Sequence, residues 1–259
     1  MGRNQIIVLS IAIVSILVMY FGCDHLPPSQ KDIDQTRAMN FTSTDITNLN
    51  AEAKASLKAS DLSDVLAFES MVTEEIDSST QLENLQALSA KWFELNRTAI
   101  SAYYAEQIAQ KVQTEDAWSI AGTTYSICLQ REKESKTIDF CKQGAVNAFE
   151  MALGIDPEDV NNRINLALVY VESPTAQQPM QGILMLRDLS EKYPENASVQ
   201  FQLGRLALMT NQLEKAIERL SNAYRLNPED KRISCLLAET YKKIGQTQKY
   251  EEFAKKCAS

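Results

Sequence analysis

The chain has 259 residues, of which 44% are hydrophobic, so it can bury one sizeable core behind a terminal segment. Its formal net charge of −8 argues against a nucleic-acid partner. A single histidine, His25, and five cysteines without metal-site spacing leave no catalytic pair or metal cluster, so we predict a non-enzymatic protein with no metal and no cofactor.

The first element is an apolar segment. From Ile6 to Gly22 it has 17 residues without a charge, which at ~1.5 Å per residue span about 25 Å, near the lower limit for a bilayer core. Arg3 before the segment and Asp24 after it favour an N-terminus on the inner side of the inner membrane and a body on the outer side. We predict a signal anchor over residues 1–23, with membrane contact through residues 6–22.

Cys23 offers an alternative for the same segment. Gly22-Cys23 after an apolar stretch resembles the cleavage site of bacterial lipoproteins, where the cysteine is lipidated. Tyr20 and Phe21 depart from that pattern, because a leucine and a small residue are usual at those positions. The body is then either held by an uncleaved anchor or lipid-anchored at Cys23, with a cleaved soluble protein as a third option.

The next part combines a tether with two helix pairs. Residues 24–43 lack apolar periodicity and contain Pro27-Pro28, so we predict a flexible tether. Residues 44–113 form an N-terminal helical region, with helices expected over 44–59, 61–76, 81–95 and 98–112. The first pair is either an unrecognisable repeat or a cap for the elements that follow. The second pair is a degenerate repeat, with apolar residues at helical spacing (Leu82, Leu85, Leu88 and Trp92).

The remainder of the chain is repetitive, and a 34-residue unit over 197–230 shows the pattern most clearly. That unit has Leu203-Gly204, Ala207, Ala216-Ile217, Leu220, Ala223 and then Pro228. Trp118, Gly122 and Tyr125 reproduce a W-x2-L-G-x2-Y signature, with Ala121 in place of the leucine. Counting in register gives units at about 115–158, 160–196, 197–230 and 231–259. The first unit carries extra residues, which we expect as an enlarged inter-helix turn within 127–144.

These residues resemble the tetratricopeptide repeat (TPR), a pair of antiparallel helices closed by a proline. The resemblance covers residues 80–259, with the recognisable repeats in 114–259. It implies an all-α fold, a TPR-type right-handed helical solenoid of antiparallel helix pairs, preceded here by one N-terminal membrane-anchor helix.

The resemblance also implies a binding surface. In the TPR family, fixed positions of the first helix of each unit line a concave groove. In this sequence those positions run from polar residues through an apolar middle to a basic end. The alternative is that the apolar members are partly core between neighbouring units. The candidate partner-binding residues are Ile164, Leu168, Val171, Phe201, Arg205, Leu208, Met209, Arg232 and Lys242.

Four cysteines fall in two pairs, each straddling one turn. Cys128 and Cys141 are equally far from the turn near Glu134-Ser135, so in an antiparallel hairpin they face each other and can form a disulfide. Cys235 and Cys257 flank the turn at Gly245 in the same way. For this second pair we favour reduced cysteine, because the repeat normally places a small buried residue at position 257.

The anchor and the repeats together resemble the membrane-anchored TPR proteins of bacterial envelopes. That resemblance implies a protein-binding scaffold in the periplasm that holds segments of partner or client proteins. The alternative is a self-assembling structural protein, a head-to-tail homo-oligomer. Residues 44–112 carry 5 basic against 11 acidic side chains, and residues 231–259 carry 7 against 3, so acidic and basic ends could attract one another.

Overall fold

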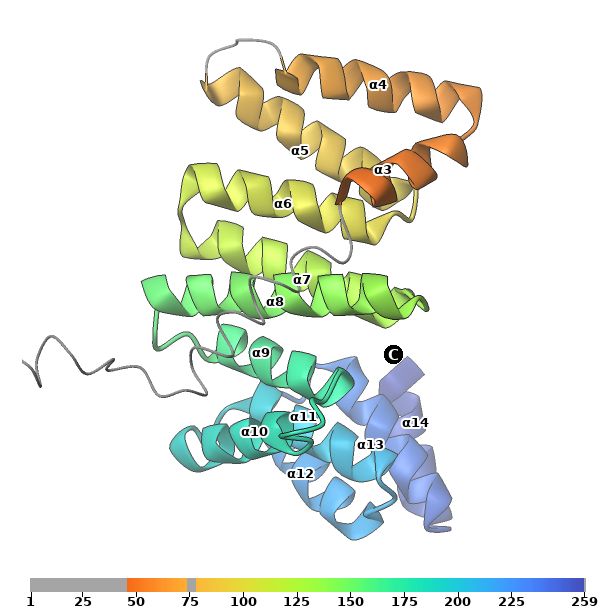
Figure 1. Cartoon of the computed structure of the whole chain (residues 1–259). Coiled ribbons are helices and arrows are strands. Elements are labelled where there is room, and N and C mark those ends of the chain that lie inside the picture. The colour runs from red at the N-terminus through yellow and green to blue at the C-terminus, as the bar shows by residue number, and fades with distance from the viewer. Residues whose placement is uncertain (1–45, 74–77, 259) are drawn as a thin grey trace, which may run out of the picture. The chain divides into compact units, whose positions relative to one another are not determined.

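The computed structural model describes residues 46–73 and 78–258, and every regular element in those residues is an α-helix. The predicted anchor, tether and Cys23 lie outside the described residues. None of the helices in the described part is long and apolar enough to cross a membrane. Labelled as in Figure 1, the helices are α3 (Ile46–Ala55), α4 (Ala59–Thr73), α5 (Ser78–Glu94), α6 (Thr98–Val112), α7 (Glu115–Arg131), α8 (Ser135–Ile155), α9 (Val160–Glu172), α10 (Gln181–Lys192), α11 (Ala197–Met209), α12 (Leu213–Leu226), α13 (Lys231–Lys243) and α14 (Thr247–Ala258).

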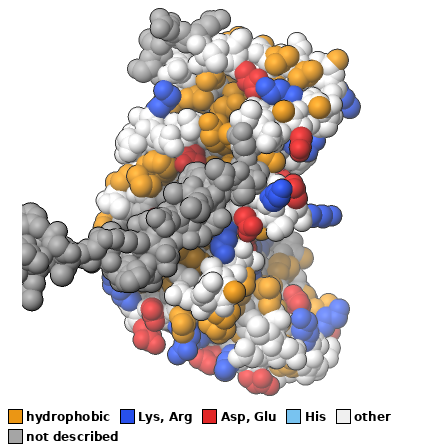
Figure 2. Space-filling view, viewed as in Figure 1, with side chains coloured by type: hydrophobic (Ala, Val, Ile, Leu, Met, Phe, Trp, Pro, Cys, Tyr) orange, Lys and Arg blue, Asp and Glu red, His pale blue; other side chains and the backbone are white. Residues whose placement is uncertain are grey.

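The helices stack in chain order. From α4 onward each helix packs against the next one along the chain, and α3 packs on α6 (Figure 1). Large apolar side chains are completely buried between successive layers, among them Trp92, Tyr125, Phe149, Leu186, Leu220 and Leu237. Charged side chains of both signs stay outside and intermingle over the face shown in Figure 2. The core is therefore a row of small clusters between neighbouring helices.

Side-chain caps start several of these helices. Thr114, Asp159 and Asn196 each accept a hydrogen bond from the backbone N–H three residues on, at the starts of α7, α9 and α11. Such a cap satisfies one of the amides that have no partner within the helix. Prolines follow the ends of α8, α10 and α12, at positions 157, 194 and 228, where a proline does not have to continue the helix.

Small residues let the two helices of a repeat approach closely. A Cβ at Gly204 would lie 2.7 Å from the Leu220 side chain, and one at Gly122 would lie 2.8 Å from the Phe149 ring. The turns inside three repeats hold Asn96, Asn211 and Gly245 at positive φ. Asparagine and glycine tolerate that left-handed conformation better than other residues.

The expected enlarged turn within 127–144 is wrong. The extra residues lengthen both helices instead, and only residues 132–134 separate α7 from α8. The reason is that apolar residues continue at helical spacing through the insertion, so Cys128, Leu129 and Cys141 are buried against the partner helix. A disulfide joins Cys128 to Cys141, with 5.9 Å between their Cα atoms.

The second cysteine pair also differs from the expectation. Cys235 and Cys257 form a disulfide with a Cα–Cα distance of 4.8 Å, whereas the repeat pattern favours reduced thiols. Both residues are half-buried at the edge of the α13–α14 hairpin, and neither fills the small core position that the repeat pattern assigns to 257. Phe253 instead occupies the core of this last hairpin, stacked on Tyr241.

Candidate partner-binding surfaces

The apolar residues assigned to the groove are mostly core. Ile164, Phe201 and Leu208 are buried, and Leu168 and Val171 are half-buried against the α9–α10 cluster. Met209 is the exception, because 70% of its surface is exposed at the end of α11. Most of the apolar area that the sequence analysis assigned to a partner is therefore buried between neighbouring units.

At the basic end of the predicted groove, Arg232 and Lys242 are exposed, and each contacts other side chains of the chain. The Arg232 guanidinium lies 5.2 Å from the centre of the Phe201 ring and pairs with Asp230 at 2.6 Å. Hydrogen bonds from Arg232 hold the pKa of the Asp230 carboxyl below its usual value. The exposed Lys242 ammonium lies over the Tyr250 ring at 5.7 Å.

Polar side chains of α7, α9 and α11 lie between the apolar and basic parts of the predicted groove. Gln130 on α7 donates a hydrogen bond to Glu172 on α9 at 2.9 Å. Burial raises the pKa of Glu172, while Gln130 and the charge of Arg205 oppose that shift. Arg205 itself donates to Gln202 at 2.9 Å. The middle of the predicted groove is therefore polar on its accessible side.

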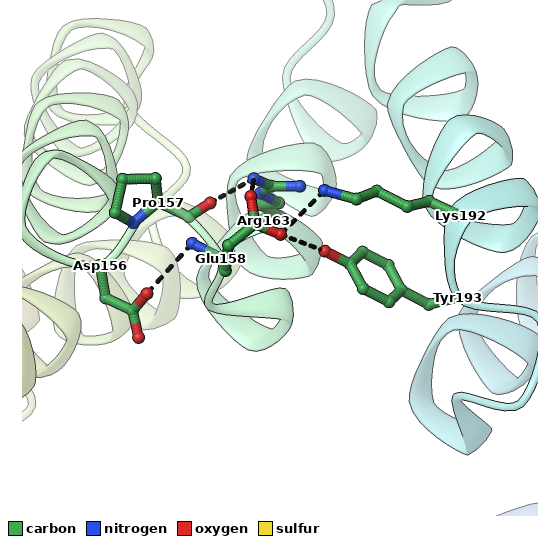
Figure 3. Close-up of polar contacts among 6 residues, drawn as sticks. All are labelled: Asp156, Pro157, Glu158, Arg163, Lys192 and Tyr193. Carbon is green, nitrogen blue, oxygen red and sulfur yellow. Dashed lines mark hydrogen bonds and ion pairs between the residues drawn. The ribbon is translucent and has the colours of Figure 1, made fainter.

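A charged cluster joins the turn before α9 to the end of α10 (Figure 3). Glu158 receives hydrogen bonds from Lys192 at 2.8 Å and Tyr193 at 2.7 Å, and it pairs with Arg163 at 3.0 Å. Arg163 also donates to the Pro157 carbonyl. These partners, Lys192 first, lower the pKa of Glu158 to about 2. The cluster holds the turn against α9 and the end of α10, with both cations paired to the Glu158 carboxylate.

A further concavity in the described residues lies away from the candidate partner-binding residues named from the sequence. It is a cleft of about 660 Å³ bounded by α5 and α7, with α6 between them. Most of its accessible lining is apolar. The lining residues are Leu82, Gln86, Ser89, Ala90, Phe93, Glu94, Ser101, Ala105, Ile108, Val112, Thr114, Asp116, Ala117, Ile120 and Thr124.

A sequence signal for this cleft existed. Phe93, Val112 and Ile120 are large apolar residues that lie off the buried stripe of their helices, and 37%, 37% and 62% of their surfaces are exposed. An exposed apolar residue alone means little, but three that line one cleft on neighbouring helices mark an interaction surface. That arrangement depends on the packing of α5, α6 and α7, which the degenerate repeat did not define.

The described part of the chain contains no group of side chains that could hold a metal ion. Across residues 46–73 and 78–258, no three histidine, cysteine, aspartate or glutamate side chains converge as a metal site would require.

Comparisons with solved structures identify the type of fold. No protein-family description matches the sequence, and no curated protein does so either. Among solved structures, TTC0263 of Thermus thermophilus, described as a thermophilic TPR protein, is 14% identical, with a TM-score of 0.50 over 76% of this chain and 98% of its own. YrrB, described as a TPR protein with an unusual peptide-binding site, is 16% identical with a TM-score of 0.38, over 67% of this chain and 83% of its own.

A third similar structure is MamA, residues 41 to the end, of Desulfovibrio magneticus RS-1. It is 16% identical with a TM-score of 0.42, over 68% of this chain and 90% of its own. The likeness to TTC0263, together with the helix pairs described above, shows that this chain has the fold of TPR proteins.

Proposed function

We propose that this chain is a non-enzymatic scaffold that binds segments of envelope proteins. The observation that carries the proposal is the apolar cleft of about 660 Å³ between α5 and α7. Its exposed Phe93, Val112 and Ile120 offer a partner an apolar area that packing among residues 46–73 and 78–258 leaves uncovered. A helical solenoid suits this role, because its stacked units present surface residues from several helices at once.

The scaffold is tethered to the membrane through residues 6–22, with its body in the periplasm. The uncharged segment between Arg3 and Asp24 supports the tether, with lipid attachment at Cys23 as the alternative. The two disulfides support an oxidising compartment, because such bonds persist outside the cytosol. Both observations favour the same side of the membrane for the folded body.

The accessible members of the predicted groove contribute a second contact region. Met209 is exposed at the end of α11, and Arg232 and Lys242 present positive charge on the following unit. These residues suit the flank of a bound segment better than its anchor, because the apolar side chains between them are buried.

In-cell crosslinking of the full-length chain tests the scaffold role. After detergent extraction, mass spectrometry identifies what remains attached to the chain, and an Ile120→Glu variant is treated in parallel. We expect a specific protein that is recovered with the natural chain and lost in the variant. A Leu184→Glu variant, at an exposed position on α10, is the matched control and retains the partner. Recovery of the chain alone would contradict the proposal.

The alternative, head-to-tail self-assembly, finds no added support in the last helix. On α14, Glu252 pairs with Lys249 at 3.3 Å and with Lys256 at 3.1 Å, so these charges satisfy one another on the outer face. A polar outer face is what a terminal repeat needs to end the stack. Association that grows as salt is lowered would restore the alternative.

A further inference from the structure

We infer that the cleft between α5 and α7 binds a short amphipathic helix with basic residues at its C-terminal end. This inference rests on the proposed scaffold function and specifies its partner. The cleft uses Ala105, Ile108 and Val112 of α6 together with the facing sides of α5 and α7. Of the cleft-lining residues, Asp116 holds a position that the TPR resemblance assigns to the groove, whereas the candidate partner-binding residues named from the sequence all fall at or after residue 164.

The dimensions of the cleft suit a helix of about three turns. Its lining runs along α6 from Ser101 to Val112, which at 1.5 Å per residue is ~16 Å. A helix with apolar residues at i, i+3, i+4 and i+7 presents a stripe of that length. Phe93 and Ile120 would meet this stripe from α5 and α7.

The charges set the polarity of the partner. The charged side chains that line the cleft are Glu94 and Asp116, both acidic. Glu94 is in the last turn of α5 and Asp116 in the first turn of α7, and α6 runs between them, so they mark opposite ends. The two ends are then distinguished by the groups that surround each carboxylate.

The Glu94 end has nearby positive charge. The Arg131 guanidinium lies 5.3 Å from the centre of the Phe93 ring and donates to Asn96. Arg97, which follows α5 closely, donates to Ser56. A basic partner group would therefore gain little at this end.

The Asp116 end is more acidic. Glu115 is adjacent and interacts electrostatically with both Asp116 and Asp159. Among the described residues, Lys111 is the basic residue at this end, where it donates to Gln81 at 2.8 Å. Asp116, with Glu115 beside it, faces this single ammonium, so the Asp116 end is less positive than the Glu94 end and favours lysine or arginine on a partner.

Helix dipoles decide which end of the partner is basic. Asp116 lies at the N-terminus of α7, and lysine or arginine is most favourable at the C-terminus of a helix. A partner whose basic C-terminal turn meets Asp116 therefore runs antiparallel to α5 and α7. This arrangement also brings the negative end of the partner's dipole to the positive end of α7.

Two designed peptides test the inference on the full-length chain in nanodiscs of zwitterionic lipid. Each is an alanine-based helix of about 14 residues with a leucine stripe and a central benzophenone. One ends in two lysines and the other in two glutamates. We expect the lysine peptide to crosslink within residues 82–124 and to bind about tenfold more tightly than the glutamate peptide.

Matched variants of the chain separate the two contributions. Asp116→Lys and Ile120→Glu should each weaken binding of the lysine peptide about tenfold, by removing the charge contact and the apolar contact. Glu214→Lys, at an acidic position in the first turn of α12, and Leu184→Glu, at an exposed apolar position on α10, should leave it within about twofold. Circular dichroism confirms that each variant stays folded.

Failure of this inference differs from failure of the scaffold function. Equal binding of the two peptides, or crosslinks outside residues 82–124, would overturn the inference. If native partners still co-purify and crosslink elsewhere on the chain, the scaffold function stands without this cleft. If no partner co-purifies, the scaffold function itself fails.

Discussion

At the scale of single residues, two helical glycines differ in what a side chain would meet. At Gly182 a Cβ would collide with the Ala167 carbonyl and lie 2.7 Å from the Val171 backbone nitrogen, so the obstacle is a neighbouring helix backbone. At Gly154, on α8, a Cβ would meet no atom within 4 Å. The first glycine is required by packing, whereas the second only weakens its helix.

Alanine at these two glycines should therefore have opposite effects. Gly182→Ala should lower the free energy of unfolding by about 1–3 kcal/mol, because backbone atoms cannot move aside cheaply. Gly154→Ala should raise it by about 0.5–1 kcal/mol, because alanine favours helix over the unfolded chain. Urea unfolding followed by circular dichroism measures both, and equal effects would contradict the packing of α9 on α10.

A second prediction at this scale concerns Glu158. Its pKa falls from 4.5 to about 2 on folding, so the folded chain favours the ionised carboxylate. The resulting stabilisation is complete above the unfolded value of 4.5 and is lost as the pH falls through about 2. Glu158→Gln should therefore destabilise the chain at pH 7 and make a much smaller difference near pH 2.

Urea midpoints of the natural chain and the Gln variant, measured across that pH range, check this expectation. Glu150→Gln, at an exposed position on α8, is the matched control. A Glu158 effect of constant size down to the lowest pH would show that Lys192 and Tyr193 do not hold the ionised form.

At the scale of helices, the sequence predicted most of the pairs, and its misses have physical causes. Glycine, alanine and proline spacing defined the units from 160 onward, because those residues meet backbone or end helices wherever the repeat occurs. The same reasoning failed at 127–144, where period counting predicted a larger turn. There the helical spacing of Tyr125 and Cys128 on α7, and of Cys141 and Ala145 on α8, was the better signal, since buried faces decide helix length.

The binding surface was less predictable than the helices. Family positions identify which side of a helix faces the groove, but they do not say how much of that side the next unit covers. Phe201 is buried for this reason, while Ile120 remains exposed at an unassigned position. The cleft depends on three helices meeting, and that arrangement is set by tertiary packing.

The α7–α8 hairpin carries a prediction of its own. The Cys128–Cys141 disulfide closes a loop with a sequence separation of 13, in a part of the chain where both cysteines are buried. Restricting the unfolded chain in this way contributes about 3 kcal/mol. The double variant Cys128→Ala and Cys141→Ala should lose about that amount in urea unfolding.

Mass spectrometry under non-reducing conditions provides the matching chemical test. We expect both pairs oxidised in the purified full-length chain, and the Cys235→Ala and Cys257→Ala double variant serves for comparison. Free thiols at 128 and 141 in a chain of unchanged stability would contradict the prediction.

At the scale of the described stack, burial is uneven along the chain. Ala53 is the one buried residue of α3 and Val65 that of α4, whereas α7 and α8 bury Trp118, Tyr125, Phe149 and several smaller residues. In a stack of nearest-neighbour contacts, such differences translate into local opening free energies.

Native-state hydrogen exchange should follow this gradient. Amides of α3 and α4 should exchange at least about tenfold faster than those of α7 and α8, because fewer buried contacts hold them. Exchange measured by mass spectrometry of peptic fragments gives each rate. Uniform rates from α3 to α8 would indicate that the stack opens as one unit.

The position of the two disulfides has a consequence for how the chain is made. Each bond joins two cysteines of one hairpin. The two cysteines are therefore synthesised soon after one another and also lie close together in the fold. A chain that emerges N-terminus first at about 5–20 residues per second exposes Cys141 about a second after Cys128. Cys235 follows several seconds later, so the first pair can close before a competitor from the second arrives. Order of emergence thereby favours pairing within each hairpin over pairing between the two hairpins.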